Sequence, residues 1–238
     1  MICLSAAKEL GKFTERSNAI HQGYLSDPKL LARYEHFVSW QTDYMLPYYE
    51  DLRATENYAA AVDFVVSDLT GISVCRRDQD IARVVPVMSK ILPDKAIRAM
   101  ASAMHLNASV LEINLQICRA LFEGKTVDAE ISEADYWSAC RRASSLDECL
   151  HLVQLIEDIG HSLDRLIRIP MIGLTLKAMR GPARLAGFAA LQEFLEKGYR
   201  TFDALEDVDQ FLKDITLRMT EVFTEIFAAD LVSDDQQH

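Results

Sequence analysis

Apolar residues recur along most of this chain at intervals of three and four, the spacing that places them on one face of an α-helix. The clearest stripe begins after Pro93 and ends before Gly124. Its members are Ile97, Met100, Met104, Ala108, Leu111, Leu115, Cys118 and Phe122. A helix of roughly 30 residues spans about 45 Å. We therefore expect a long central helix that packs against several others.

Two further stripes predict long helices in the second half of the chain. The first begins at Ser145, which has Glu148 three residues later in the spacing of a capping box, and Pro170 should end or kink it. Its apolar side carries Leu146, Cys149, Val153, Ile156, Gly160, Leu163 and Ile167. The second is the C-terminal stripe Val208, Phe211, Ile215, Met219, Val222 and Ile226. Both patterns indicate helices with one buried face.

Shorter signals place helices between these stripes. Caps or first-turn prolines predict helix starts at Pro28, Asp78, Ser132 and Pro182, and Pro47 should kink or end the first of these helices. Few segments alternate as a half-buried strand would, and no repeat or flexible linker divides the chain. We therefore predict an all-α, single-domain bundle of about nine or ten helices over residues 1–229. Residues 230–238 form a polar tail that we expect to fray.

Charge narrows the classes of partner. The chain has 238 residues, is 50% hydrophobic and carries a formal net charge of -11. A nucleic-acid-binding protein needs a basic surface to displace counterions, so no nucleic-acid partner is expected. The same charge opposes simple electrostatic docking on an anionic membrane. The sequence shows neither a signal peptide nor a transmembrane segment, which favours a cytoplasmic location.

The five cysteines are widely spaced and odd in number. In a chain of this size that pattern is typical of reduced thiols in a cytosolic protein, used as small apolar residues on helices. No P-loop, GxGxxG, HExxH or GxSxG motif is present, and we predict no cofactor and no metal. Two carboxylate-x-x-His pairs occur, ending at His151 and His161, but about 15 Å of helix separates them, too far for one metal centre.

One helix face carries the best catalytic candidates. Glu157, His161, Asp164 and Arg168 follow one another at i, i+4, i+7 and i+11 in the helix that begins at Ser145. A histidine between two carboxylates could act as a general acid or base, with Glu157 and Asp164 adjusting its protonation. The alternative interpretation is a ladder of salt bridges.

A reversal of charge marks a second candidate site. Between Ser162 and Phe188 the chain is apolar and basic, with Asp164 as its one acid. The basic residues are Arg165, Arg168, Lys177, Arg180 and Arg184. They could bind a small anion, an acidic protein segment or a lipid headgroup. Alternatively, they pair with acids elsewhere in the fold.

Two parts of the chain are similar to a known family. The segment DFVVSDLTG (63–71), followed by RRDQDIARVVPVMSKILP (76–93), resembles the uncharacterised bacterial FFLEELY-motif proteins, and residues 155–202 resemble them too. In this chain the name-giving motif reads FVVSDLT (64–70), without its second aromatic residue and both glutamates. The resemblance implies a bacterial, cytosolic protein and supplies no catalytic residue.

Two functional hypotheses follow. The first is a helical protein that acts by binding a partner or by forming a homodimer, with the basic stretch as its contact surface. The second is a helical enzyme or small-molecule-binding protein with an inter-helix pocket near His161. The absent motifs and the acidic composition favour the first.

Overall fold

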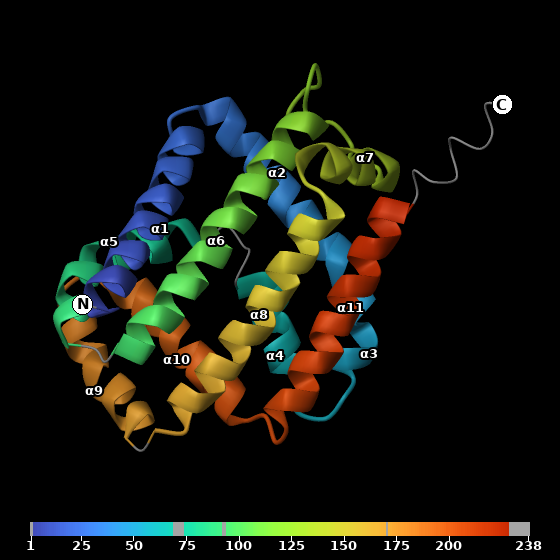
Figure 1. Ribbon diagram of the computed structural model, residues 1–238. Helices are drawn as coiled ribbons and strands as arrows, with labels where there is room; N and C mark the ends of the chain where they lie inside the picture. The colour runs from blue at the N-terminus through green and yellow to red at the C-terminus, as the bar shows by residue number, and fades with distance from the viewer. Residues whose placement is uncertain (1, 69–73, 92–93, 170, 229–238) are drawn as a thin grey trace.

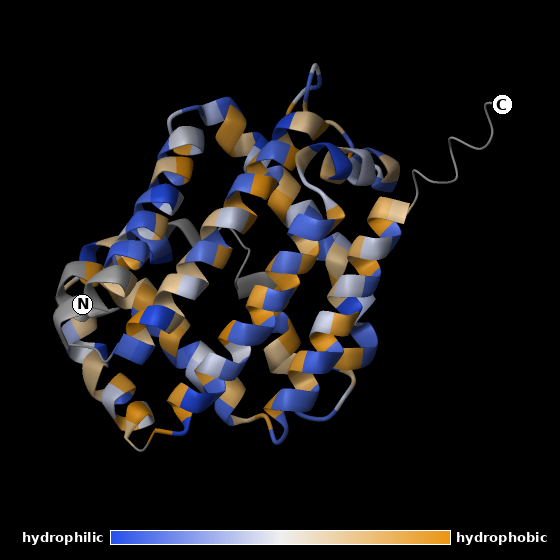
Figure 2. Ribbon diagram, viewed as in Figure 1, coloured by the Kyte–Doolittle hydropathy of each residue, from blue (hydrophilic) through white to orange (hydrophobic). Residues whose placement is uncertain are grey.

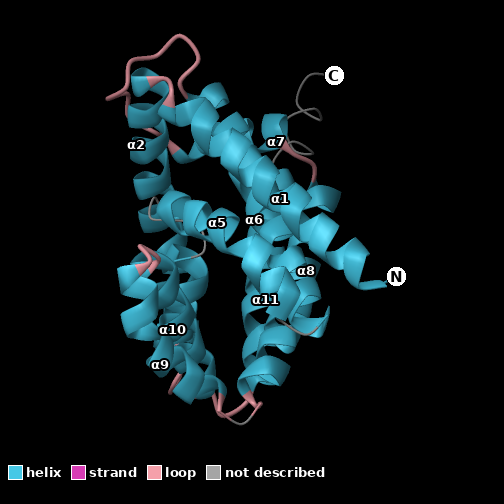
Figure 3. Cartoon of the chain, turned by 90° about the vertical axis from the view of Figure 1, so that its left-hand side faces the viewer, coloured by secondary structure: helices cyan, strands magenta, loops and turns pink. Residues whose placement is uncertain are grey.

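The computed structural model describes residues 2–68, 74–91, 94–169 and 171–228, and every element in these ranges is helical (Figures 1 and 3). The α-helices are α1 (Ile2–Leu25), α2 (Pro28–Met45), α3 (Glu50–Arg53), α4 (Ala59–Asp63), α5 (Val74–Ile91), α6 (Asp94–Leu121), α7 (Glu133–Ala143), α8 (Leu146–Ile167), α9 (Ile172–Leu185), α10 (Ala189–Asp203) and α11 (Val208–Ala228). A 3-10 helix, η1 (Leu46–Tyr49), follows α2, and a π-helical turn, η2 (Phe64–Asp68), follows α4.

The predicted all-α class is confirmed. Within the described ranges, nine helices have between 11 and 28 residues, which agrees with the predicted nine or ten. Three predicted starts, at Pro28, Ser132 and Ser145, are confirmed. Asp27 accepts from the backbone of Lys29 and Leu30 at the start of α2, and Ser145 forms the reciprocal capping box with Glu148.

The 28-residue helix α6 runs through the middle of the bundle, as its stripe predicts (Figure 1). It packs against α1, α2, α7 and α8, and the predicted positions from Ile97 to Cys118 lie on its buried face, apart from the half-buried Met100. Gly124 ends the turn that follows with a φ of 68°, a conformation that glycine adopts without a steric penalty. The helix with the longest apolar stripe therefore lies at the centre of the core.

Three apolar clusters fill the interior along this axis. One joins α2, α6 and α7 around Phe37 and Phe122; a second joins α4, η2 and α11 around Phe211. The third lies between α1, α5 and α6 around Leu10 and Ile97. Burial of these side chains supplies the main driving force for folding.

Two predicted helix starts are wrong. Asp78 does not cap a helix: α5 begins at Val74, and the carboxylate lies buried in the interior. Pro182 lies inside α9, near its C-terminal end, where its missing N–H removes only the bond to the Ala178 carbonyl. The break between α9 and α10 falls at Gly187, whose φ is 79°. A left-handed residue interrupts a helix more decisively than a proline in its last turns.

Helix α1 is absent from the sequence prediction, although it has 24 residues. Its buried positions include Thr14, Ser17 and His21, which are polar. The hydrophobic pattern cannot identify a face whose buried residues are polar. Pro47 ends α2 as predicted, whereas Pro170 and the tail at 230–238 lie outside the described residues.

Candidate functional site

Helix α9 lies at the edge of the molecule, on the outside of α10 (Figures 1 and 3). It packs mainly on α10 and touches α8 less, and only Ala183 among its residues is buried. Apolar side chains nonetheless line its outer side, where Leu174 is 62% and Leu185 is 92% exposed. Figure 2 shows the resulting mixture of apolar and polar residues along α9. Exposed aliphatic side chains of this kind, gathered on one helix, mark interaction surfaces.

Apart from Met179, which is 46% exposed, the exposed apolar residues of α9 lie in one heptad row. Met171, at the N-cap and 69% exposed, begins a row with alternating spacings of three and four. We call this row the α9 seam: Met171, Leu174, Ala178, Gly181 and Leu185. In heptad notation these are the a and d positions, which form the contact line of a coiled coil. The buried Ala183, at an f position, lies on the opposite side, against the protein.

The five predicted basic residues divide into paired and unpaired groups. The Arg180 guanidinium forms a double hydrogen bond with Glu196 of α10, which lowers the pKa of that carboxyl to about 2. Arg168 pairs with Asp164, one turn before it on α8, at 2.8 Å. These two arginines fit the salt-bridge alternative.

The remaining basic residues are exposed. Arg165 donates to the Ser162 hydroxyl at 3.0 Å. Neither Lys177 nor Arg184 has an ion-pair partner among the described residues. Both occupy g positions, directly beside the seam, and α9 contains no acidic residue. The sequence indicated a basic apolar stretch. Only the fold shows that Arg168 and Arg180 form ion pairs, whereas Lys177 and Arg184 form none with the described residues.

The His161 group is arranged differently from the predicted row. The imidazole lies 3.2 Å from Asp209 of α11 and 3.9 Å from Glu157, while Asp164 pairs with Arg168. Glu157 also lines a groove of about 500 Å³ between α8 and α11. The other lining residues are Leu150, Val153, Gln154, Lys213, Thr216, Leu217 and Thr220. The histidine is thus placed beside an inter-helix groove, with a second carboxylate that the sequence did not indicate.

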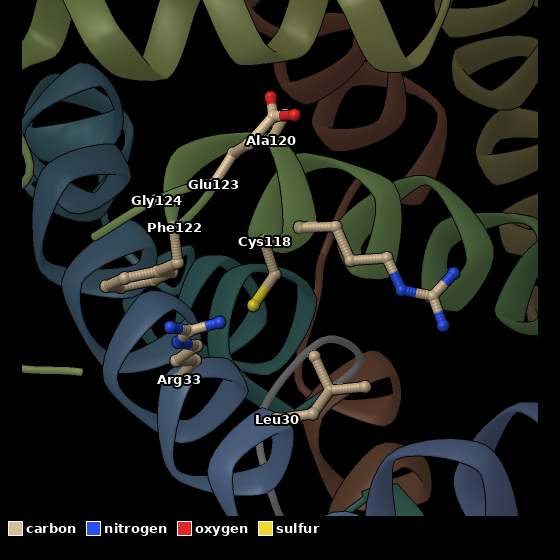
Figure 4. A pocket seen from close by; sticks show the side chains of 8 residues that line it. Leu30, Arg33, Cys118, Ala120, Phe122, Glu123 and Gly124 are labelled. Atoms are coloured by element: carbon tan, nitrogen blue, oxygen red, sulfur yellow. The ribbon is translucent and has the colours of Figure 1, made fainter. Parts of the chain in front are cut away.

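A second pocket, of about 320 Å³, lies where α6 ends beside α2 (Figure 4). Arg33 donates to the Lys125 carbonyl at 2.6 Å, and its Nε is buried without a hydrogen-bond partner among the described residues. Figure 4 shows the guanidinium below the Phe122 ring and near the Cys118 thiol, whereas Glu123 points away. Burial raises the pKa of Cys118 to about 12, so this thiol is not a nucleophile at neutral pH. The negative end of the α6 dipole opposes anion binding here.

The buried charged cluster around Asp78 was not predicted. His21 Nε2 donates to Asp78 at 2.9 Å, and the Tyr24 hydroxyl lies 2.6 Å from His21 Nδ1. Arg77 donates to the other Asp78 oxygen at 3.0 Å, and Asn107 donates to Asp78 at 2.6 Å. Because His21 and Asp78 lie 57 positions apart, no local pattern joins them.

This cluster is structural. His21 is 1% and Asp78 is 0% exposed, and neither pocket described above includes them. The network ties α1, α5 and α6 together, and the Arg77 guanidinium also stacks 4.5 Å from the Phe194 ring of α10. Hydrogen bonds to the carboxylate compensate for its burial.

The described histidine, cysteine and carboxylate side chains are dispersed through the fold. Within the described part of the chain, no group of three or more histidine, cysteine, aspartate and glutamate side chains is arranged to hold a metal ion. Cys118, Cys140 and Cys149 are free and buried, which confirms their role as apolar residues, and burial raises the pKa of all three thiols. None of the described helices combines the length and apolar character needed to cross a membrane.

A family model described as a domain of unknown function, DUF8198, matches residues 21–232. That range contains all helices from α2 to α11, together with the last turn of α1. Searches of curated proteins and of solved structures found no match.

Proposed function

Because the chain belongs to a family whose described domain has no assigned function, we propose its function from the site itself: this is a binding protein that docks a helix of a partner on the α9 seam. The observation that carries the proposal is the heptad row of exposed residues from Met171 to Leu185. A coiled-coil contact line facing solvent leaves apolar area that a partner helix would bury. Lys177 and Arg184 beside it supply charge for orientation and specificity.

The anchoring of α9 supports this proposal. Arg180 and Gln192 fix the helix to α10: Arg180 pairs with Glu196, and the Gln192 amide donates to the Leu176 carbonyl at 2.6 Å. These two contacts set the orientation of α9 on α10. The inner side of α9 thus holds the helix in place, while the outer side stays free for contact.

Site-specific photocrosslinking tests the proposal. A benzophenone amino acid at position 174 should give discrete crosslinked products in cells of the source organism, and Arg184→Glu should remove them. The matched control places the same group at Leu25 of α1, which is also exposed and apolar but lies outside the seam and both pockets. Equal crosslinking from both positions, or products insensitive to Arg184→Glu, would contradict docking on α9.

A second function has one specific observation in its favour. The groove between α8 and α11 is lined by Glu157, which contacts His161. A small-molecule site there would use His161 as an acid or base, or as a hydrogen-bonding group. Native mass spectrometry of the purified protein should then show a retained ligand that His161→Ala abolishes. Unchanged ligand retention in a folded His161→Ala variant argues against this function.

We also propose that the protein is one of the bacterial FFLEELY-motif proteins and that it is located in the cytoplasm. The order of segments from Asp63 onwards supports the family, and the acidic composition with reduced, buried thiols supports the location. Docking on α9 requires no cofactor and no metal.

A further inference from the structure

We infer that the partner docked on the α9 seam is an acidic amphipathic helix of another protein, an inference that rests on the proposed function. The heptad of α9 places Lys177 and Arg184 at its two g positions. Its e positions are Thr175 and Pro182, which carry no charge. Charges at e and g select the partner in a coiled coil, so two basic g positions match a helix with glutamate or aspartate beside its own apolar row.

A second copy of this chain fits the seam poorly. In a two-fold antiparallel pair, Leu174 of one copy would lie near Leu185 of the other, which suits the apolar row. The same arrangement brings Lys177 of one copy beside Arg184 of the other, without an acidic residue in either α9. Like charges facing each other at a contact line destabilise it. The charges therefore favour a different, acidic partner.

The acidic character of the whole chain does not cancel this preference. The net charge of -11 is spread over 238 residues, and exposed charges farther apart than about 8 Å are largely screened at physiological ionic strength. Two carboxylates beside the basic stretch, Asp164 and Glu196, are already paired with Arg168 and Arg180. Within α9 itself, the charges that flank the seam are those of Lys177 and Arg184.

The sizes of the side chains along the α9 seam indicate which side chains a partner helix should present. Ala178 and Gly181 form a shallow centre between Leu174 and Leu185, and the space above Gly181 is open. A partner helix should therefore present its largest apolar side chains to this centre. Leu174 and Leu185 are eleven positions apart, so the contact extends for about 16 Å, or three helical turns.

Designed peptides test this inference directly. The acidic probe is a helical peptide of about 21 residues, three heptads long, with leucine at a and d and glutamate at e and g. The basic control has lysine in place of each glutamate. Fluorescence anisotropy should show binding of the acidic peptide to the full-length protein, weakened by salt, and about tenfold weaker binding of the basic peptide.

Charge reversal supplies the decisive comparison. The double variant Lys177→Glu/Arg184→Glu should bind the basic peptide more tightly than the acidic one. The single variant Leu174→Asp should weaken the binding of both peptides. Lys29→Glu, at an exposed position of α2 outside the seam and both pockets, is the matched control and should leave the binding of both peptides unchanged. A peptide preference unaffected by reversal at 177 and 184, or a peptide affinity unaffected by Leu174→Asp, overturns the inference, because the peptide would then bind elsewhere.

Other occupants of the seam give different results. Self-association in sedimentation that Leu185→Asp abolishes, without peptide binding, would identify a second copy. Binding to vesicles rich in anionic lipid, with the same residue dependence and without peptide binding, would identify a membrane surface. A second copy overturns the acidic partner and keeps α9 as a protein-docking helix. A membrane surface, or crosslinking insensitive to the seam, overturns the proposed function itself.

Discussion

Among single residues, Asp78 is a carboxylate that the fold buries completely. Its carboxylate is fully buried, and it accepts hydrogen bonds from His21, Arg77 and Asn107, which come from three helices. Such a carboxylate is tolerated only because cationic and polar donors surround it. Removing the Asp78 side chain takes away the ion pair that this carboxylate forms with the buried Arg77 guanidinium.

We expect Asp78→Ala to destabilise the protein by about 3–5 kcal/mol, the range found when one partner of a buried ion pair is removed. Urea denaturation measures the change. Asp43→Ala is the matched control, because Asp43 is exposed on α2, and its effect should stay within about 0.5 kcal/mol. Equal stabilities for the two variants would show that the cluster does not support the fold.

An ion pair between Arg180 and Glu196 helps to hold α9 against α10. Arg180 lowers the pKa of Glu196 from its ordinary 4.5 to about 2. A carboxyl whose pKa is lower in the folded state stabilises the fold above its unfolded pKa, and this contribution is lost as the pH falls from about 4.5 towards 2. Carbon-detected NMR titration should therefore place the Glu196 midpoint near 2, and Arg180→Ala should return it towards 4.5. A midpoint near 4.5 in the unmodified protein would contradict the pairing.

At the scale of elements, Gly160 decides how closely α8 and α11 approach. A Cβ at this position would overlap the side chain of Leu212, which is buried on α11. Glycine removes that obstacle and lets the two helices pack along their apolar faces. The sequence placed Gly160 correctly in the buried stripe, but its partner depends on the arrangement of helices.

Gly160→Ala should therefore destabilise the protein by about 1–3 kcal/mol, the usual effect of overpacking. In the Leu212→Ala background the same substitution should cost much less, because the obstructing atoms are gone. Gly23→Ala in α1 is the control: its Cβ meets no atom within 4 Å, so a gain of about 0.5–1 kcal/mol is expected from helix propensity. Additive effects at 160 and 212 would refute the close contact.

At the scale of the whole molecule, stability is unevenly distributed. Helix α6 buries ten residues along its length, whereas α9 buries only Ala183. Helices with few buried contacts open locally at little free-energy cost. A peripheral helix of this kind can receive a partner without disturbing the core.

Hydrogen exchange monitored by mass spectrometry should show this gradient. Amides of α9 should exchange fastest among the helices of eleven or more residues, and those of α6 slowest. Binding of the acidic peptide should slow exchange in α9 and leave α6 unchanged. Equal protection of α9 and α6 in the free protein would contradict the peripheral role of α9.

Most of the secondary structure could be predicted from the sequence where the buried face of a helix is apolar. The stripes of α6, α8 and α11 and the capping box at Ser145 belong to this group. Prediction failed for α1 and at Asp78, because a polar network replaces apolar burial there. The basic stretch could be recognised in the sequence, but the ion pairs of Arg168 with Asp164 and of Arg180 with Glu196 could not.

The sequence by itself determined the helical class, the long central helix and the excess of basic charge between Ser162 and Phe188, because these depend on residue types and on spacings within one helix. The packing of the helices settles three further points: Arg168 and Arg180 are paired while Lys177 and Arg184 have no ion-pair partner among the described residues, Asp209 rather than Asp164 adjoins His161, and His21 contacts Asp78. Each of these outcomes depends on which helices pack together. Packing joins residues far apart in the chain, and no local periodicity records such contacts.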